Sequence, residues 1–310
     1  MIERDRVRSF MLVAVLLAGV ATIVVRAGQQ QPATYLVEVD AVVTDDDGKP
    51  VVGLKQGDFE VKDDGKRVEL KTFEEVRETD QRAVARSIVL LLDDSGFGAG
   101  NTLTIQQIAR MFVARMAPPD EFSVIRLSNR RDEAFGDRLE ALLRIQEYRS
   151  DTLPFFGRET RENALQMFAK VARTLEAVEH RRKALVCIGV ADVCSLPEPG
   201  GRFDVLWKFW VDTVGAMGRS NASVYSLEPR GAPRRNAITG GTIADITGGE
   251  VFLNTTDLNR PIDVVRRETG NYYLLGYWPS ASDKPLHSIE VRVNKRGVRV
   301  RARRVRGESA

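Results

Sequence analysis

Runs of consecutive apolar residues alternate with stretches of helical periodicity through the middle of the chain. Residues 87–92 read Ser-Ile-Val-Leu-Leu-Leu, with five apolar positions in a row. Such a run is typical of a strand buried on both faces. Residues 102–116 carry apolar side chains at helical spacing, and two prolines end that helix. The repetition predicts an α/β fold, a parallel sheet covered by helices. Further strands are predicted at 121–127, 183–190, 222–227 and 250–254, and further helices at 138–148, 163–177, 207–217 and 241–247.

Both flanks of this region have β character instead. Four short strands are predicted between residues 35 and 75, and three more at 271–277, 287–293 and 297–305. Each set is too small to hold a core alone. We therefore expect the two sets to pack together as a small sandwich-like module. The basic stretch 299–306 is interpreted as an edge strand with exposed arginines, with contact to anionic lipid or nucleic acid as the alternative.

The amino-terminal residues have the pattern of an export signal. Three arginines lie within residues 1–8, and residues 10–25 are apolar and uncharged. We predict a signal peptide over 1–27, with an uncleaved anchor as the alternative, followed by a linker over 28–34. The expected domains are then an amino-terminal β segment (35–80), an α/β domain (84–256) and a carboxyl-terminal β segment (262–305). The folded part is expected in the periplasm, in the cell envelope or secreted.

Composition and rare residues exclude several classes of function. The 310 residues carry a net charge of only +3, so no nucleic-acid partner is expected. The two histidines, His180 and His287, lie far apart in unrelated contexts, which gives no support to a zinc site. His180 is expected at a solvated helix end. Cys187 is most simply a small buried apolar residue, and a bond to Cys194 is the alternative.

Two carboxylates, a hydroxyl and a glycine follow the first apolar run, as Asp93-Asp94-Ser95-Gly96. Open α/β sheets bind ligands at the carboxyl ends of their strands. Asp93 and Ser95 are two residues apart, so their side chains can point into the same crevice. Oxygen ligands of this kind suit Mg²⁺, Ca²⁺ or Mn²⁺. An ordinary strand-to-loop turn is the alternative interpretation.

This turn resembles the first half of the metal-ion-dependent adhesion site of von Willebrand factor A (VWFA) domains, with Phe97 where a second serine is usual. The mature chain, over about residues 35–303, is similar to the VWFA-related proteins of acidobacteria. The resemblance implies a VWFA-like (Rossmann-like) fold flanked by amino- and carboxyl-terminal β segments. The segments that carry the similarity are 42–54, 58–65, 182–186, 243–250, 272–277 and 287–291.

The same resemblance implies a set of metal ligands. Asp93 and Ser95 match the first two positions, and Thr160, in the loop before the helix at 163, stands for the family's threonine. Asp192 is the nearest carboxylate to the family's later aspartate, about two positions late. Because Phe97 offers no oxygen, we expect a degenerate site that binds Mg²⁺ or Ca²⁺ weakly or only serves as a turn. Asp94 and Glu159 are further loose candidates.

We do not expect an enzyme. No histidine lies near Ser95 in sequence to activate it as a nucleophile, and adjacent carboxylates at a strand end point apart. The chain is predicted to be an exported VWFA-like binding protein that recognises a protein or surface ligand through loops at the carboxyl end of the sheet. The alternative is a structural or assembly component of the envelope, and a hydrolase is a third hypothesis. Membrane contact is expected only through an uncleaved amino-terminal segment.

Overall fold

The computed structural model describes residues 35–78, 85–95, 99–128, 134–150, 157–178, 182–201, 204–229, 241–279 and 284–307. The predicted signal peptide or anchor and linker lie outside these residues, as do Phe97 and His180. Within the described part of the chain, every helix is too short or too polar to span a bilayer.

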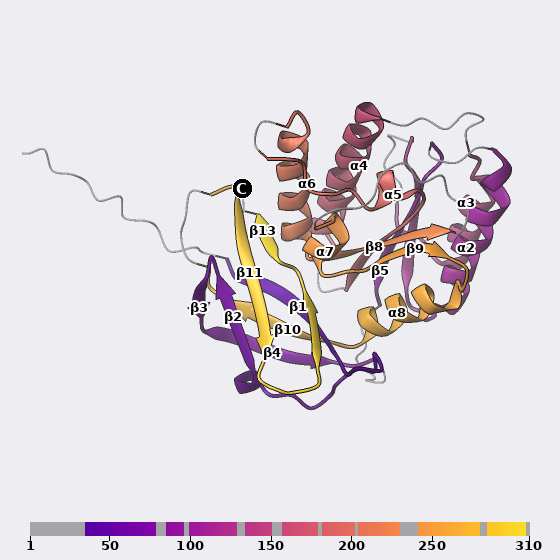
Figure 1. Cartoon of the computed structure of the whole chain (residues 1–310). Helices are drawn as coiled ribbons and strands as arrows, with labels where there is room; N and C mark the ends of the chain where they lie inside the picture. Colours follow the sequence, from indigo (N-terminus) through magenta and orange to yellow (C-terminus); the bar gives the residue numbers. More distant parts are fainter. Residues whose placement is uncertain are drawn as a thin grey trace, which may run out of the picture. The chain divides into compact units, whose positions relative to one another are not determined.

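A five-stranded parallel sheet forms the centre of the α/β part (Figure 1). Its strand order is β6-β5-β7-β8-β9, and all neighbours run in parallel. Strand β5 therefore lies inside the sheet, and all of its residues are buried. The predicted α/β class with a helix-covered parallel sheet is confirmed. The strands are β5 (Ser87–Leu92), β6 (Glu121–Arg126), β7 (Lys183–Ile188), β8 (Ala222–Pro229) and β9 (Val251–Thr255).

Helices lie on both sides of this sheet (Figure 1). Helix α4 packs against α6, and α2 packs against α3 and α8. Their apolar faces join the strands in one continuous core. The helices are α2 (Thr102–Arg115), α3 (Arg138–Glu147), α4 (Arg158–Glu176), the single turn α5 (Ala191–Cys194), α6 (Trp207–Ser220), α7 (Ile243–Thr247) and α8 (Asn259–Gly270).

Two helix predictions need correction. Helix α8 lies partly within the segment 262–305 that was predicted to be β. The helix was missed because its short polar sequence has a proline, Pro261, near its start. Proline is nevertheless well accepted in the first turn of a helix. Helix α4 begins at Arg158 rather than at 163. Its first turns carry polar side chains that are exposed or half-buried, so apolar periodicity alone does not detect them. Thr160 is therefore in a helix and not in the preceding loop.

The remaining strands form two antiparallel sheets that combine both flanks of the chain. One has the order β12-β1-β10-β4 and the other β13-β11-β2-β3. Their inner faces share a separate core that includes Val39, Val61 and Leu275. The strands are β1 (Val37–Thr44), β2 (Phe59–Asp63), β3 (Lys66–Val68), β4 (Leu70–Val76), β10 (Tyr272–Tyr277), β11 (Leu286–Val293), β12 (Arg299–Ala302) and β13 (Val305–Gly307); a single turn, η1 (Gln56–Asp58), precedes β2.

The arginine-rich tail differs from the single exposed edge strand that was predicted. It divides into β12 and β13, which are edge strands of different sheets. Arg303 is buried and donates hydrogen bonds to the carbonyl oxygens of Gly218 and Glu38. Arg306 is also buried, and it pairs with Asp63. These arginines are enclosed because β13 packs against helix α6, and their partners come from distant parts of the chain.

Candidate functional site

Asp93 connects the carboxyl ends of two neighbouring parallel strands. It directly follows β5 and is 0% exposed. Its Oδ1 accepts hydrogen bonds from Ser95 N at 3.0 Å and Ser95 Oγ at 3.1 Å. Its Oδ2 accepts a hydrogen bond from Val190 N at 3.1 Å, just beyond the end of β7. The carboxylate therefore holds its own turn and joins it to the adjacent strand.

Asp94 makes the corresponding connection on the other side of β5. Its two oxygens accept hydrogen bonds from Ser128 N at 3.0 Å and Ser128 Oγ at 2.5 Å, just past the end of β6. Tyr148, which follows α3, donates to the carbonyl oxygen of Asp93 at 2.7 Å. The two adjacent carboxylates thus point to different neighbours, as expected at a strand end.

A disulfide lies against the same turn. Cys187, in β7, is bonded to Cys194, at the end of α5, and both are buried. The preferred interpretation of Cys187 as a free apolar residue is therefore wrong, and the alternative is correct. The single turn α5 folds back on the end of β7 and brings the two sulfurs together. Between them lies Gly189, where an added Cβ would come within 2.3 Å of the Asp93 Cβ and 2.8 Å of Cys194 Sγ.

The predicted metal ligands are brought together only in part. Asp93 Oδ1 and Ser95 Oγ lie 3.1 Å apart. That is close to the spacing of about 2.9 Å between adjacent oxygens around an octahedral Mg²⁺. Thr160 is half-buried in the first turn of α4 and forms no hydrogen bond with either residue within the described segments. The side chain of Asp192 lies outside the described residues. Two protein oxygens would leave most of a Mg²⁺ shell to water or to a partner.

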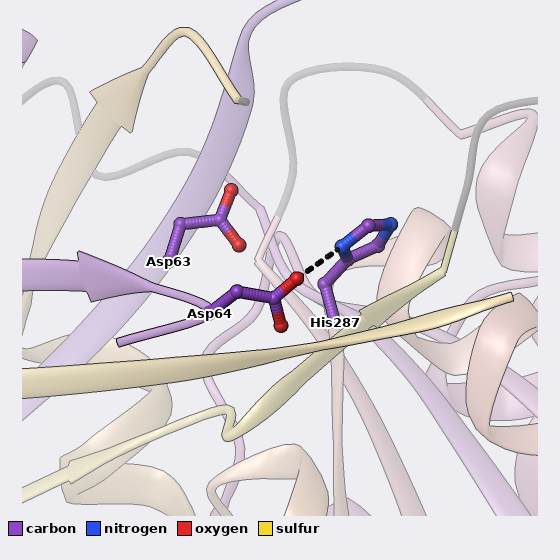
Figure 2. Close-up of side chains that lie close together, drawn as sticks. All are labelled: Asp63, Asp64 and His287. Carbon is purple, nitrogen blue, oxygen red and sulfur yellow. Dashed lines mark hydrogen bonds and ion pairs between the residues drawn. The ribbon is translucent and has the colours of Figure 1, made fainter. Parts of the chain in front are cut away.

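A second cluster of possible ligands lies in the sandwich and was missed in the sequence. Asp63 ends β2, Asp64 follows it, and His287 is in β11 (Figure 2). His287 Nδ1 lies 3.0 Å from Asp64 Oδ2, and Ser288 N donates to Asp64 Oδ1 at 3.0 Å. Finding this cluster from the sequence requires the register that places β2 beside β11, because 223 residues separate Asp64 and His287.

The carboxylates of this cluster already have cationic partners. Arg306 contacts Asp63 with Nε at 3.1 Å and with NH2 at 3.0 Å. Lys284 Nζ lies 3.2 Å from Asp64. Burial alone would raise the pKa of Asp64, but hydrogen bonds from His287, Ser288 and Lys284 outweigh it and hold this pKa well below its usual range. The other ring nitrogen, Nε2, points away from both carboxylates in Figure 2. This arrangement fits a structural connection better than a metal centre.

Comparisons with known proteins give only distant similarities. No protein-family model matches the chain, and no curated protein matches it. Two structures of proximal thread matrix protein 1 from the mussel byssus are 9% and 12% identical, cover 65% and 75% of this chain, and each have a TM-score of 0.40. The human COPII-coat protein Sec24c is 10% identical over 78% of this chain, with a TM-score of 0.37. The chain spans 48–50% of the length of these structures. Similarity at this level assigns neither a family nor a function.

Proposed function

We propose that this chain is an exported, non-enzymatic binding protein with a VWFA-like domain, which recognises a protein or surface ligand at the carboxyl end of its parallel sheet. One observation carries the proposal. The turn Asp93–Ser95 leaves an interior strand of that sheet and is fixed to the ends of both neighbouring strands, through Val190 and Ser128. Ligands of open α/β sheets bind at this edge. We call this edge the rim.

Rigidity of the rim supports a role in recognition. The disulfide between Cys187 and Cys194 closes the turn beneath Asp93. A surface that is already ordered loses less conformational freedom when a partner binds. Disulfides also persist mainly in oxidising compartments, which agrees with the export signal proposed for residues 1–27.

A cation at the rim would be held by Asp93 and Ser95. When bound, it would supply a positive charge to which a carboxylate of the partner could coordinate. Both Asp93 oxygens already accept hydrogen bonds from the chain itself, so we propose that any such binding is weak and that recognition rests chiefly on the loops. Burial of Asp93 and Asp94 also supports a structural role over acid–base catalysis.

The test is capture of a partner with the mature chain immobilised, using envelope extract of the source cells. A rim variant, Glu159→Lys, changes an exposed position in the first turn of α4 and leaves the hydrogen bonds between Ser128 and Asp94 intact. We expect it to lose a protein that the wild type retains. Glu290→Lys changes an exposed residue of the sandwich and serves as the control. If the wild type and the rim variant capture the same proteins, and the chain also associates with itself, the results would instead support the structural alternative.

The metal component is tested separately by melting temperature in Mg²⁺, Ca²⁺ or chelator. A ligand that binds only the native state raises the melting temperature. We expect a small rise at millimolar metal that Ser95→Ala abolishes. Thr174→Ala, an exposed change on α4 away from the rim, is the matched control and should leave the rise intact. An unchanged melting temperature in the wild type would show that the rim binds without metal.

A further inference from the structure

A cavity of about 500 Å³ lies at the opposite end of the parallel sheet from the rim. Its walls are the amino ends of parallel strands and the outer face of the sheet β12-β1-β10-β4. This volume is within the range of small-molecule sites, about 300–1,000 Å³. The charged lining residues are Glu38, Asp40, Glu74, Glu78 and Asp120, with Arg86, Arg182 and Lys183 as the cations.

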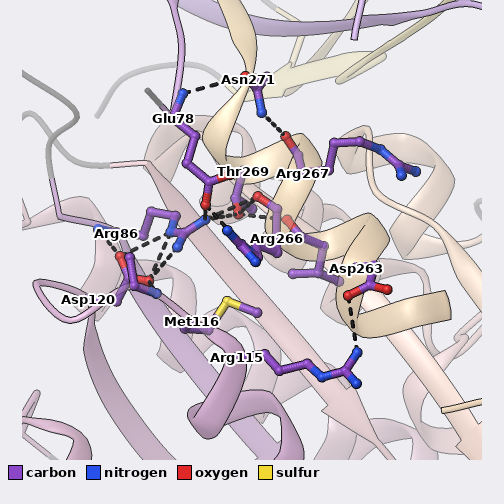
Figure 3. Close-up of polar contacts among 12 residues, drawn as sticks. Glu78, Arg86, Arg115, Met116, Asp120, Asp263, Arg266, Arg267, Thr269 and Asn271 are labelled. Atoms are coloured by element: carbon purple, nitrogen blue, oxygen red, sulfur yellow. Dashed lines mark hydrogen bonds and ion pairs between the residues drawn. The ribbon is translucent and has the colours of Figure 1, made fainter. Parts of the chain in front are cut away.

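Most of these charges neutralise one another inside the protein. Arg86 contacts Asp120 with NH2 at 2.5 Å, and it lies 3.8 Å from Glu78 (Figure 3). Arg182 forms an ion pair with Asp40. The side chains of both pairs are nearly fully buried, so they are held in place by the fold. They shape the cavity but leave little charge for a ligand.

Three charged groups remain. Glu38 and Glu74 are exposed, and neither side-chain carboxylate forms a hydrogen bond or ion pair within the described part of the chain. Lys183 is half-buried and likewise has no such partner among the described residues. Burial lowers the pKa of Lys183, against the opposing effect of Asp40, Glu176 and Glu38. Among the lining residues, two carboxylates therefore remain against a single ammonium group, so the lining carries an excess of negative charge, which the buried Arg303 beside Glu38 offsets in part.

Strand register places the two free carboxylates at opposite sides of an apolar floor. Leu274 of β10 pairs with Asp40 on one side and Glu74 on the other, and Glu38 pairs with Gly276. Residues that pair directly share a face of the sheet. With strands about 4.8 Å apart, the Cα atoms of Glu38 and Glu74 are about 10–12 Å from each other. Leu274 and the ring of Tyr272 lie in the cavity wall as well.

We propose that this cavity binds a linear aliphatic diamine or polyamine. One ammonium group pairs with Glu38 and another with Glu74, while the methylene chain lies over Leu274 and Tyr272. Lys183 repels the ligand and limits its affinity. This site is independent of the rim, because none of its residues contributes to the turn at Asp93.

The experiment is isothermal titration calorimetry of the mature chain with spermidine and with 1,5-diaminopentane at low ionic strength. We expect both amines to bind and the uncharged 1,5-pentanediol to give no signal. The double variant Glu38→Gln with Glu74→Gln should weaken amine binding about tenfold or more, because two charge-assisted contacts are lost. Glu147→Gln, an exposed change on α3 outside the cavity, should bind like the wild type.

A variant with the opposite effect keeps the proposal falsifiable if the double variant is unstable. Lys183→Met removes the repelling ammonium group and should tighten amine binding several-fold. Melting temperatures establish that each variant is folded. The proposal is overturned if neither amine binds the wild type, if the folded double variant binds like the wild type, or if Lys183→Met leaves the affinity unchanged or weaker. None of these results depends on capture of a partner at the rim.

Discussion

Arg182, the residue immediately before strand β7, forms an ion pair with Asp40 in the middle of strand β1, and both side chains are buried. The guanidinium group also donates to Ser223 Oγ at 3.1 Å and lies 4.9 Å from the ring centre of Tyr272. One side chain thus joins the parallel sheet to an antiparallel sheet. Since both charges are removed from water, each depends on the other for its stability.

Removal of either member of this pair should be costly. Asp40→Ala is expected to lower the free energy of unfolding by about 3–5 kcal/mol, because it leaves the Arg182 charge buried without its partner. The double variant Asp40→Ala with Arg182→Met should lose less than the sum of the two single changes. Urea denaturation of all four proteins measures this coupling. Strictly additive losses would show that the pair does not act as a unit.

Asp64 should make stability depend on pH in acid. Its pKa is lowered in the folded state and is about 3.9 when unfolded. Its contribution is therefore complete above about pH 5 and is lost as the pH falls toward the folded value. Asp64→Asn should cost about 1 kcal/mol at pH 7 and flatten the acid dependence. The measurement is chemical denaturation from pH 7 to pH 3. Asp47→Asn, at an exposed turn position, should retain the wild-type profile.

The disulfide should contribute measurably to stability. It closes a loop with a sequence separation of 7 residues. On the chain-entropy model, such a loop corresponds to about 2.5 kcal/mol. Replacement of Cys187 and Cys194 by alanine should lower the free energy of unfolding by about this amount. Thiol labelling of the unfolded wild type should detect no free cysteine before reduction and two afterwards. Labelling without reduction would contradict the bond.

Helix α6 should tolerate no side chain at Gly218. An added Cβ there would lie 2.8 Å from Gly307 N and 3.0 Å from the Cα of Arg306 in β13. Gly218→Ala is expected to destabilise the protein by about 1–3 kcal/mol, because backbone on both sides would have to move. Gly57→Ala has open space around its Cβ and is the control. Equal melting temperatures for the two variants would argue against the close packing of α6 and β13.

Local patterns were sufficient to predict the centre of the molecule. Five apolar residues before Asp93 identify a strand buried on both faces, and the structure places it inside a parallel sheet. Periodicity was less informative where a helix begins with polar turns, as α4 does, or is short and contains proline, as α8 does. In these cases the burial that stabilises the element comes from tertiary packing, which a short window of sequence does not contain.

Side-chain environments were harder to predict than elements. The placement of Asp93 and Asp94 at a strand end follows from the sequence, but their bonds to Val190 N and Ser128 depend on the register of three strands. The burial of Arg306 depends on Asp63, which is 243 residues away in the chain. Charged residues in an alternating strand are usually interpreted as exposed, and only the position of such a distant partner shows otherwise.

The two antiparallel sheets have a consequence for the order of synthesis. Strand β10 separates β1 from β4, and β11 separates β13 from β2. When synthesis has reached only β9, all five strands of the parallel sheet are present, but β1 and β4 still lack the strand that lies between them, and β2 is paired only with β3. Such unpaired strands are prone to aggregate. During synthesis, half of the strands of the sandwich are therefore present before the strands β10 to β13, which complete both sheets, have been made.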